Sequence, residues 1–116
     1  MGTTRSAKSK GRLGQQEVRD KFLKTFPELQ PDDVKSQIMG VNGEDIVLSP
    51  WAREYIPLSI EVKRRASFKT LYNFIEQAQS NKYEPVVFLR GDRQPWLTVC
   101  NSDHYINLLR KSHAKK

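Results

Sequence analysis

Residues 56–63 alternate at every position between large aliphatic residues and other residues. This pattern predicts a β-strand with one buried face, because successive side chains of a strand point to opposite sides of the sheet. Glu61 and Lys63 then project from the same exposed face, roughly 6.6 Å apart along the strand. A carboxylate and an ammonium group are therefore expected side by side at the end of this strand.

A second acid, Asp45, follows a turn signal that precedes this strand. Asn42 and Gly43 form a dipeptide typical of two-residue β-hairpins, here between predicted strands at about 35–41 and 44–49. Asp45 is therefore expected on the strand that neighbours Glu61. Two carboxylates and an ammonium group so placed can hold a divalent cation and orient a water molecule, which is the chemistry of a metal-dependent nuclease.

The remaining elements follow from hydrophobic periodicity and from helix-breaking residues. A first helix is predicted from about Arg12 to Phe26 and ends at Pro27, with one apolar arc that packs on the core. Pro50 and Trp51 open a connection of several residues toward the Glu61 strand. The later elements are predicted as a helix over 68–81 capped by Ser67, strands over 85–90 and 96–100, and a final helix that starts near Ser102.

This order, αβββαββα, predicts an α/β domain in which helices flank a mixed sheet. The expected organisation is a flexible basic arm over 1–10, a single domain over 11–112 and a basic tail over 113–116. A chain of 116 residues is long enough for one modest core.

The charge balance favours a polyanionic partner. Lys and Arg number 20 against 13 Asp and Glu, which gives a formal net charge of +7, and such an excess suggests nucleic acid. The basic residues cluster before the first helix and directly after Lys63. The candidates for contact with DNA phosphates are Arg5, Lys8, Lys10, Arg12, Arg64, Arg65 and Lys69.

Several other classes of protein are not supported by the sequence. No apolar run approaches the ~20 residues that a membrane span requires, and the polar, basic start of the chain is unlike a secretion signal. Cys100 is the single cysteine, which rules out an internal disulfide. The histidines lack partners at zinc-ligand spacing. We therefore expect a cytoplasmic protein with no membrane association.

The order of elements, with an acid on the second strand and Glu61-x-Lys63 on the third, resembles the PD-(D/E)xK nuclease superfamily, whose core is αβββαβ. The resemblance covers about residues 10–100. With its small size, basic arm and Glu17 in the first helix, the chain is most similar to the archaeal and phage Holliday-junction resolvases. It departs from the family pattern at Glu44, where a proline is expected before Asp45.

The resemblance implies a role for each matching residue. Asp45 and Glu61 would be the ligands of Mg²⁺, with the main-chain carbonyl of Val62 as a third, and Mn²⁺ is expected to substitute. Lys63 would orient or help to deprotonate the attacking water. The implied reaction is phosphodiester hydrolysis that leaves a 5′ phosphate and a 3′ hydroxyl.

Two further residues match the family less closely. Glu17 resembles the catalytic glutamate of the family's first helix, but its position away from the apolar arc also fits a solvated helix residue. Gln77 resembles a glutamine on the helix that follows the motif in related nucleases and would contact DNA. The alternative for Gln77 is an ordinary surface glutamine.

The function implied is that of a Mg²⁺-dependent, structure-selective DNA endonuclease that resolves four-way junctions in recombination and repair, in the host cytoplasm if the chain is phage-encoded. A homodimer is expected, because two symmetric cuts require two sites related by a twofold axis. Its interface is expected on the final helix, with Tyr105, Ile106 and Leu109, or around Trp51. The alternatives are a restriction, repair or nicking nuclease of the same superfamily, and a non-catalytic basic nucleic-acid-binding module.

Overall fold

The computed structural model describes residues 4–38 and 43–114, and the side chains of residues 7–38 and 43–113. The chain divides into two compact units. Unit 1 comprises residues 1–65 and 106–116, and unit 2 comprises residues 66–105. The prediction of a single domain over 11–112 stays a prediction.

Helix α1 of unit 1 spans Thr4–Thr25. It begins at Thr4 and not at Arg12, so residues 4–10, predicted as a flexible arm, are helical in the structure. The physical reason is that this stretch contains no proline and several good helix formers, so a helix nucleated on the core can extend through it. The apolar arc is confirmed, since Phe22 is buried, as is Phe26 just beyond the helix.

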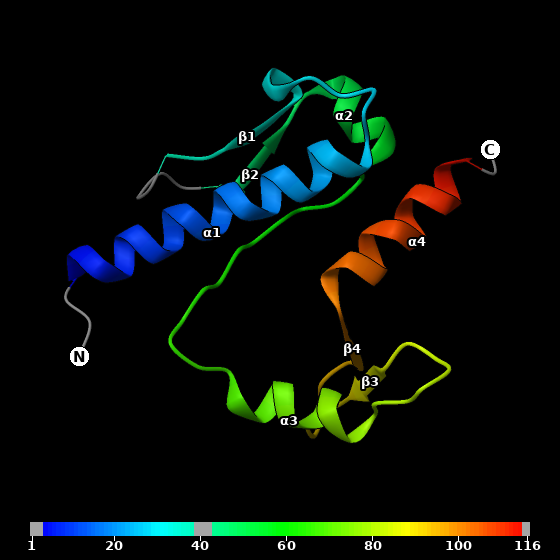
Figure 1. Cartoon of the computed structure of the whole chain (residues 1–116). Coiled ribbons are helices and arrows are strands. Elements are labelled where there is room, and N and C mark those ends of the chain that lie inside the picture. The colour runs from blue at the N-terminus through cyan, green and yellow to red at the C-terminus, as the bar shows by residue number, and fades with distance from the viewer. Residues whose placement is uncertain (1–3, 39–42, 115–116) are drawn as a thin grey trace. The chain divides into compact units, whose positions relative to one another are not determined.

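A short β-hairpin packs beside α1 (Figure 1). Its strands are β1 (Val34–Ser36), which follows the 3₁₀ turn η1 (Pro31–Asp33), and β2 (Ile46–Leu48). They pair antiparallel, with Val34 opposite Leu48. Both strands are shorter than predicted, and Asn42, predicted in the turn, lies outside the described residues. Gly43 has φ +113°, a conformation that side-chain-bearing residues rarely adopt.

Helix α2 (Pro50–Tyr55) occupies the segment that the sequence predicted to be a connection. Its start follows ordinary capping rules: Ser49 Oγ accepts a hydrogen bond from the backbone N–H of Ala52 at 3.0 Å, and Pro50 stands at the first helical position. The Ser49 hydroxyl donates to Asp33 Oδ1 at 2.7 Å. Ala52 and Tyr55 are buried, so α2 is held on the core.

Residues 56–63 form no assigned strand, which corrects the prediction of a third ladder strand here. The predicted alternation is nevertheless present: Ile56 is buried, the later aliphatic residues of the segment are half-buried, and the residues between them are exposed. A backbone bond to the hairpin region runs from the Asp45 N–H to the Ile60 carbonyl, at 3.0 Å. The segment is therefore strand-like in the direction of its side chains but lacks a regular ladder.

The last helix, α4 (Ser102–Ala114), begins where predicted. Asn101, the residue before it, accepts a hydrogen bond from the Asp103 N–H at 3.0 Å. Ile106 belongs to the core of unit 1, and Leu109 packs against that core. The remaining members of this core come from α1, the hairpin, α2 and the connections: Phe22, Phe26, Leu29, Val34, Ile46, Leu48, Ala52, Tyr55 and Ile56.

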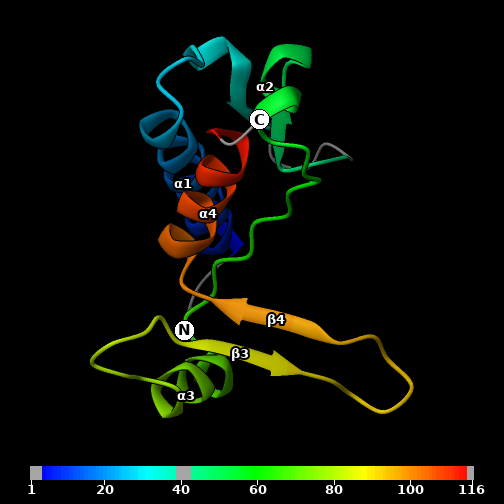
Figure 2. The same ribbon diagram turned by 90° about the vertical axis from the view of Figure 1, so that its right-hand side faces the viewer.

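Unit 2 contains α3 (Lys69–Gln77) and a second hairpin, formed by β3 (Val86–Leu89) and β4 (Leu97–Cys100). These strands pair antiparallel, with Val87 opposite Val99, and α3 packs against both of them (Figure 2). All three elements were predicted here, although α3 ends at Gln77 and not at the predicted residue 81. The Lys69 N–H bonds to Ser67 Oγ at 3.2 Å, but Ser67 is not the cap that was predicted, because the N-cap residue of α3 is Phe68.

The structure is thus a mixed α/β protein with four α-helices and two two-stranded antiparallel sheets in the described residues. The predicted single mixed sheet is replaced by one sheet in each unit. A restriction-endonuclease-like arrangement of the elements stays a prediction.

Candidate functional site

Asp45 lies between Gly43 and the first residue of β2, and its backbone is hydrogen-bonded on two sides. Its N–H donates to the Ile60 carbonyl at 3.0 Å, and its own carbonyl accepts from the Gln37 N–H at 2.8 Å. Asp45 therefore joins the β1 side of the hairpin region to the extended segment that carries Glu61. This confirms the predicted proximity of the backbone at Asp45 to that segment.

The carboxylate of Asp45 makes a further bond to the same segment. The Val62 N–H donates to Asp45 Oδ2 at 2.6 Å. Within the described part of the chain, the other oxygen, Oδ1, accepts no hydrogen bond. One oxygen of Asp45 is thus held against the Glu61–Val62 peptide, and the other remains available to a ligand.

The side chains of Glu61 and Lys63 are exposed, whereas Ile60 and Val62 between and beside them are half-buried and pack against the core. The sequence predicted this alternation and the shared face of Glu61 and Lys63. Because both charged groups reach solvent, a substrate as large as a nucleic acid can approach them. The Val62 side chain holds the tripeptide onto the core.

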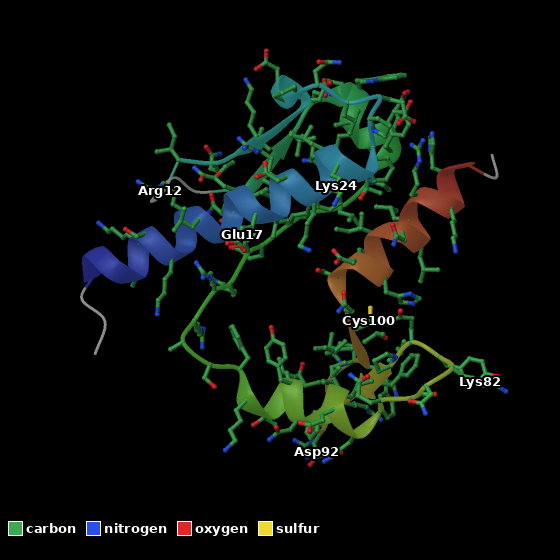
Figure 3. All side chains as sticks on the ribbon, in the orientation of Figure 1. Arg12, Glu17, Lys24, Lys82, Asp92 and Cys100 are labelled. Carbon is green, nitrogen blue, oxygen red and sulfur yellow. The ribbon has the colours of Figure 1, made fainter. Side chains whose placement is uncertain are left out.

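The middle of α1 approaches the same segment closely at Gly14. A Cβ added at Gly14 would lie 3.3 Å from Arg64 Cβ and 3.5 Å from Val62 Cγ1, so a glycine permits this approach. Glu17 follows one turn later on α1 and is exposed (Figure 3). A place for Glu17 in the site stays a prediction.

Sequence reasoning missed an ion pair beside Asp45. Arg53, on α2, forms a salt bridge from Nη2 to Glu44 Oε1 at 2.6 Å. Its Nη1 donates to the Leu58 carbonyl at 2.6 Å. The Ser49-Pro50 start signal could have revealed α2, but no sequence pattern links Arg53 to Glu44 and to a main-chain carbonyl at once.

The predicted DNA-contacting residues are distributed over both units. In unit 1, Lys8, Lys10 and Arg12 are exposed on α1, and the Arg5 side chain falls outside the described side chains. Arg64 and Arg65 are exposed directly after Lys63. In unit 2, Lys69 and Gln77 are exposed at the two ends of α3. The predicted phosphate contacts are therefore accessible in each unit where the side chains are described.

The ligands predicted for a cation are hard oxygen donors. Two carboxylates, Asp45 and Glu61, and the carbonyl of Val62 match the ligand preference of Mg²⁺, which keeps several of its own waters in protein sites. No group of three or more His, Cys, Asp and Glu side chains that could hold a metal occurs among the described residues. Any cation here would therefore depend on this smaller set together with substrate oxygens and water.

Comparison with protein-family models, with characterised proteins and with solved structures finds no match to this chain. None of the helices in the described ranges is both long and apolar enough to span a bilayer.

Proposed function

We propose that this protein is a Mg²⁺-dependent DNA endonuclease of the PD-(D/E)xK type. The observation that supports it most is the 2.6 Å hydrogen bond from the Val62 N–H to Asp45 Oδ2. This bond joins Asp45 to the Glu61-Val62-Lys63 tripeptide. The nuclease chemistry was predicted from this combination of residues. The exposure of Glu61 and Lys63 beside it is what a polymeric substrate requires.

In this proposal Asp45, Glu61 and the Val62 carbonyl hold the cation. When bound, Mg²⁺ lowers the pKa of a coordinated water and neutralises charge on the scissile phosphate. Lys63 donates hydrogen bonds to the attacking water or to a phosphate oxygen, which stabilises the negative charge that develops during hydrolysis. The Val62 N–H fixes the orientation of the Asp45 carboxylate.

The proposed substrate is DNA, in particular a four-way junction. The net charge of +7 favours a polyanionic partner. The exposed Lys and Arg side chains of α1 and those at 64–65 would contact DNA phosphates and would not read the nucleobase sequence. The proposed site of action is the cytoplasm.

A homodimer is proposed because paired incision needs two sites. Ile106, one of the residues predicted at the dimer interface, is only 4% exposed and belongs to the core of unit 1. It is therefore removed from the proposed interface. Trp51 and Tyr105, at 49% and 43% exposure, remain candidates for it.

The test is cleavage of labelled four-way junction, duplex and single-stranded DNA, with and without Mg²⁺. Asp45→Asn and Glu61→Gln should abolish cleavage and leave DNA affinity equal or higher, because each removes a negative charge that repels phosphate. Asp92→Asn, an exposed acid in the β3–β4 turn of unit 2 (Figure 3), is the matched control and should cleave like the unaltered protein.

Wild-type rates in both site variants would refute the assignment of the site. Mg²⁺-dependent cutting of plain duplex as fast as of junctions, by a protein that sediments as a monomer, would favour a repair or nicking nuclease. Tight binding with no cutting of any substrate would favour the non-catalytic module.

A further inference from the structure

Arg53 occupies a position between the two segments that carry the proposed acids. Its guanidinium bonds to Glu44 Oε1 through Nη2 and to the Leu58 carbonyl through Nη1, each at 2.6 Å. Glu44 directly precedes Asp45, and Leu58 lies three residues before Glu61. One side chain therefore links the Asp45 segment to the Glu61 segment.

The link is anchored in the core and not in a flexible loop. Arg53 lies on α2, between the buried residues Ala52 and Tyr55. Its own N–H bonds to the Ser49 carbonyl at 2.9 Å. Ser49 is in turn bonded to Asp33, whose pKa is held below its ordinary value by hydrogen bonds from the Gln30 N–H and the Ser49 hydroxyl. The position of the guanidinium is thus set by packing and capping.

The chemistry of the contact suits arginine in particular. A guanidinium is planar and presents several N–H donors in a fixed fork, so it can bond to a carboxylate and a carbonyl at the same time. The side chains of Arg53 and Glu44 are only 38% and 32% exposed. Glu44 Oε2 is buried and has no hydrogen-bond partner among the described residues. Loss of Arg53 would leave both oxygens of this carboxylate without a hydrogen-bond partner among the described residues.

These bonds add to those made by Asp45 itself. The two segments are joined by the Asp45 N–H to Ile60, by the Val62 N–H to Asp45 and by the two bonds of Arg53. Among the described residues of these segments no regular β-ladder fixes their register. The side-chain hydrogen bonds of Arg53 and Asp45 therefore hold the two segments together in place of most of the backbone bonds of a ladder.

We infer that Arg53 is a positioning residue, which holds Asp45 and Glu61 at the separation that cation binding requires by clamping Glu44 to the Leu58 carbonyl. This inference rests on the proposed nuclease function. Arg53 acts through its neighbours and does not touch the substrate. Outer partners of metal-binding groups commonly affect metal affinity or activity by about 10- to 100-fold.

The experiment compares Arg53→Gln, Arg53→Lys and Arg19→Gln. Arg19 is the matched control, because it loses the same charge from a surface pair with its neighbour Asp20 on α1. For each protein we would measure cleavage rate against Mg²⁺ concentration, DNA affinity without Mg²⁺, and hydrogen exchange of the Asp45 and Val62 amides. The Phe26 amide, bonded to the Phe22 carbonyl at 2.9 Å, serves as the reference for the core.

Arg53→Gln should raise the Mg²⁺ concentration for half-maximal rate by about 10- to 100-fold, with DNA affinity close to that of Arg19→Gln. The Asp45 and Val62 amides should lose protection while that of Phe26 does not change. Arg53→Lys should recover part of the Mg²⁺ response, since a lysine keeps the charge but lacks the fork.

An unchanged Mg²⁺ response with unchanged exchange at Asp45 and Val62 would overturn the inference. Equal loss of protection at Phe26 would also overturn it, because Arg53 would then be a general stability residue. If the unaltered protein cuts no DNA, the proposed function fails. Amide exchange in Arg53→Gln would still decide in that case whether Arg53 clamps the two segments.

Discussion

Unit 1 has a closed apolar core, and unit 2 has none. In unit 1, Phe26, Val34, Ile46, Ala52 and Ile56 are fully buried. Every residue of unit 2 is described, and not one of them is buried. Large apolar side chains on its surface include Tyr72, Tyr83, Phe88 and Trp96.

Both units nevertheless follow the same local rules. Each pairs an amphipathic helix with a short antiparallel hairpin, and in β3 exposed and half-buried residues alternate as a strand predicts. The difference is that in unit 1 two further elements, α2 and the part of α4 that carries Ile106 and Leu109, close the core. Regular local structure is therefore not sufficient for burial, and the elements that support Asp45 and Arg53 are those with a core beneath them.

The largest effect should come from exchanging one phenylalanine for alanine in each unit. Phe26→Ala removes a fully buried ring and should reduce the free energy of unfolding by about 3–5 kcal/mol. Phe88→Ala removes a ring that is 68% exposed, and its effect should stay below about 1 kcal/mol. Urea unfolding followed by circular dichroism measures both. Equal losses of unfolding free energy in the two variants would show that Phe88 is buried in solution. The contrast between a unit with a core and a unit without one would then be wrong.

A smaller effect should follow from exchanging a glycine for leucine in each unit. Gly14 packs closely against Arg64 and Val62. A Cβ added at Gly14 would already lie 3.3 Å from Arg64 Cβ. Gly14→Leu should therefore displace the site segment and cost about 1–3 kcal/mol. Gly91, whose added Cβ would meet Gln94 Cγ at 3.7 Å, has room, and Gly91→Leu should change stability by less than about 0.5 kcal/mol.

The same urea titration distinguishes the two glycine variants. The amide spectrum of residues 60–64 should change in Gly14→Leu alone. An unchanged spectrum there would mean that α1 does not contact this segment in solution.

The smallest effect should be a pH dependence that belongs to unit 1. The hydrogen bond from Arg110 holds the pKa of Glu28 below its ordinary value of 4.5. The ionised carboxylate is thus favoured in the folded state, and its contribution is present above pH 4.5 and is lost as the pH falls through the lowered pKa. Glu28→Gln should lower the urea midpoint at about pH 7, and by less at about pH 3.

The matched control for this titration is Glu84→Gln, an exposed acid of unit 2. Its midpoint should match that of the unaltered protein at both pH values. A difference in urea midpoint between Glu28→Gln and the unaltered protein that does not change with pH would contradict this prediction. It would show that the ionised form of Glu28 does not stabilise the fold through its bond to Arg110.

The sequence was sufficient for the parts of the fold that depend on neighbours along the chain. The apolar arc of α1, the antiparallel pairing of β1 with β2, α3 and the β3–β4 hairpin all follow from periodicity and turn chemistry over fewer than about a dozen residues. The mixed α/β class follows from the same patterns. The start of α1 and the existence of α2 were missed, because helix ends depend on weak propensities and α2 is too short to show a period.

For the candidate site, the alternation in residues 56–63 determined that Glu61 and Lys63 share an exposed face while Ile60 and Val62 turn inward. That result needs only the two-residue period of an extended chain. The hydrogen bond from Val62 to Asp45, the approach of Gly14 and the clamp by Arg53 were decided by the tertiary structure alone. Each joins residues from segments whose relative position depends on how the core of unit 1 closes, and no pattern within one segment encodes that distance.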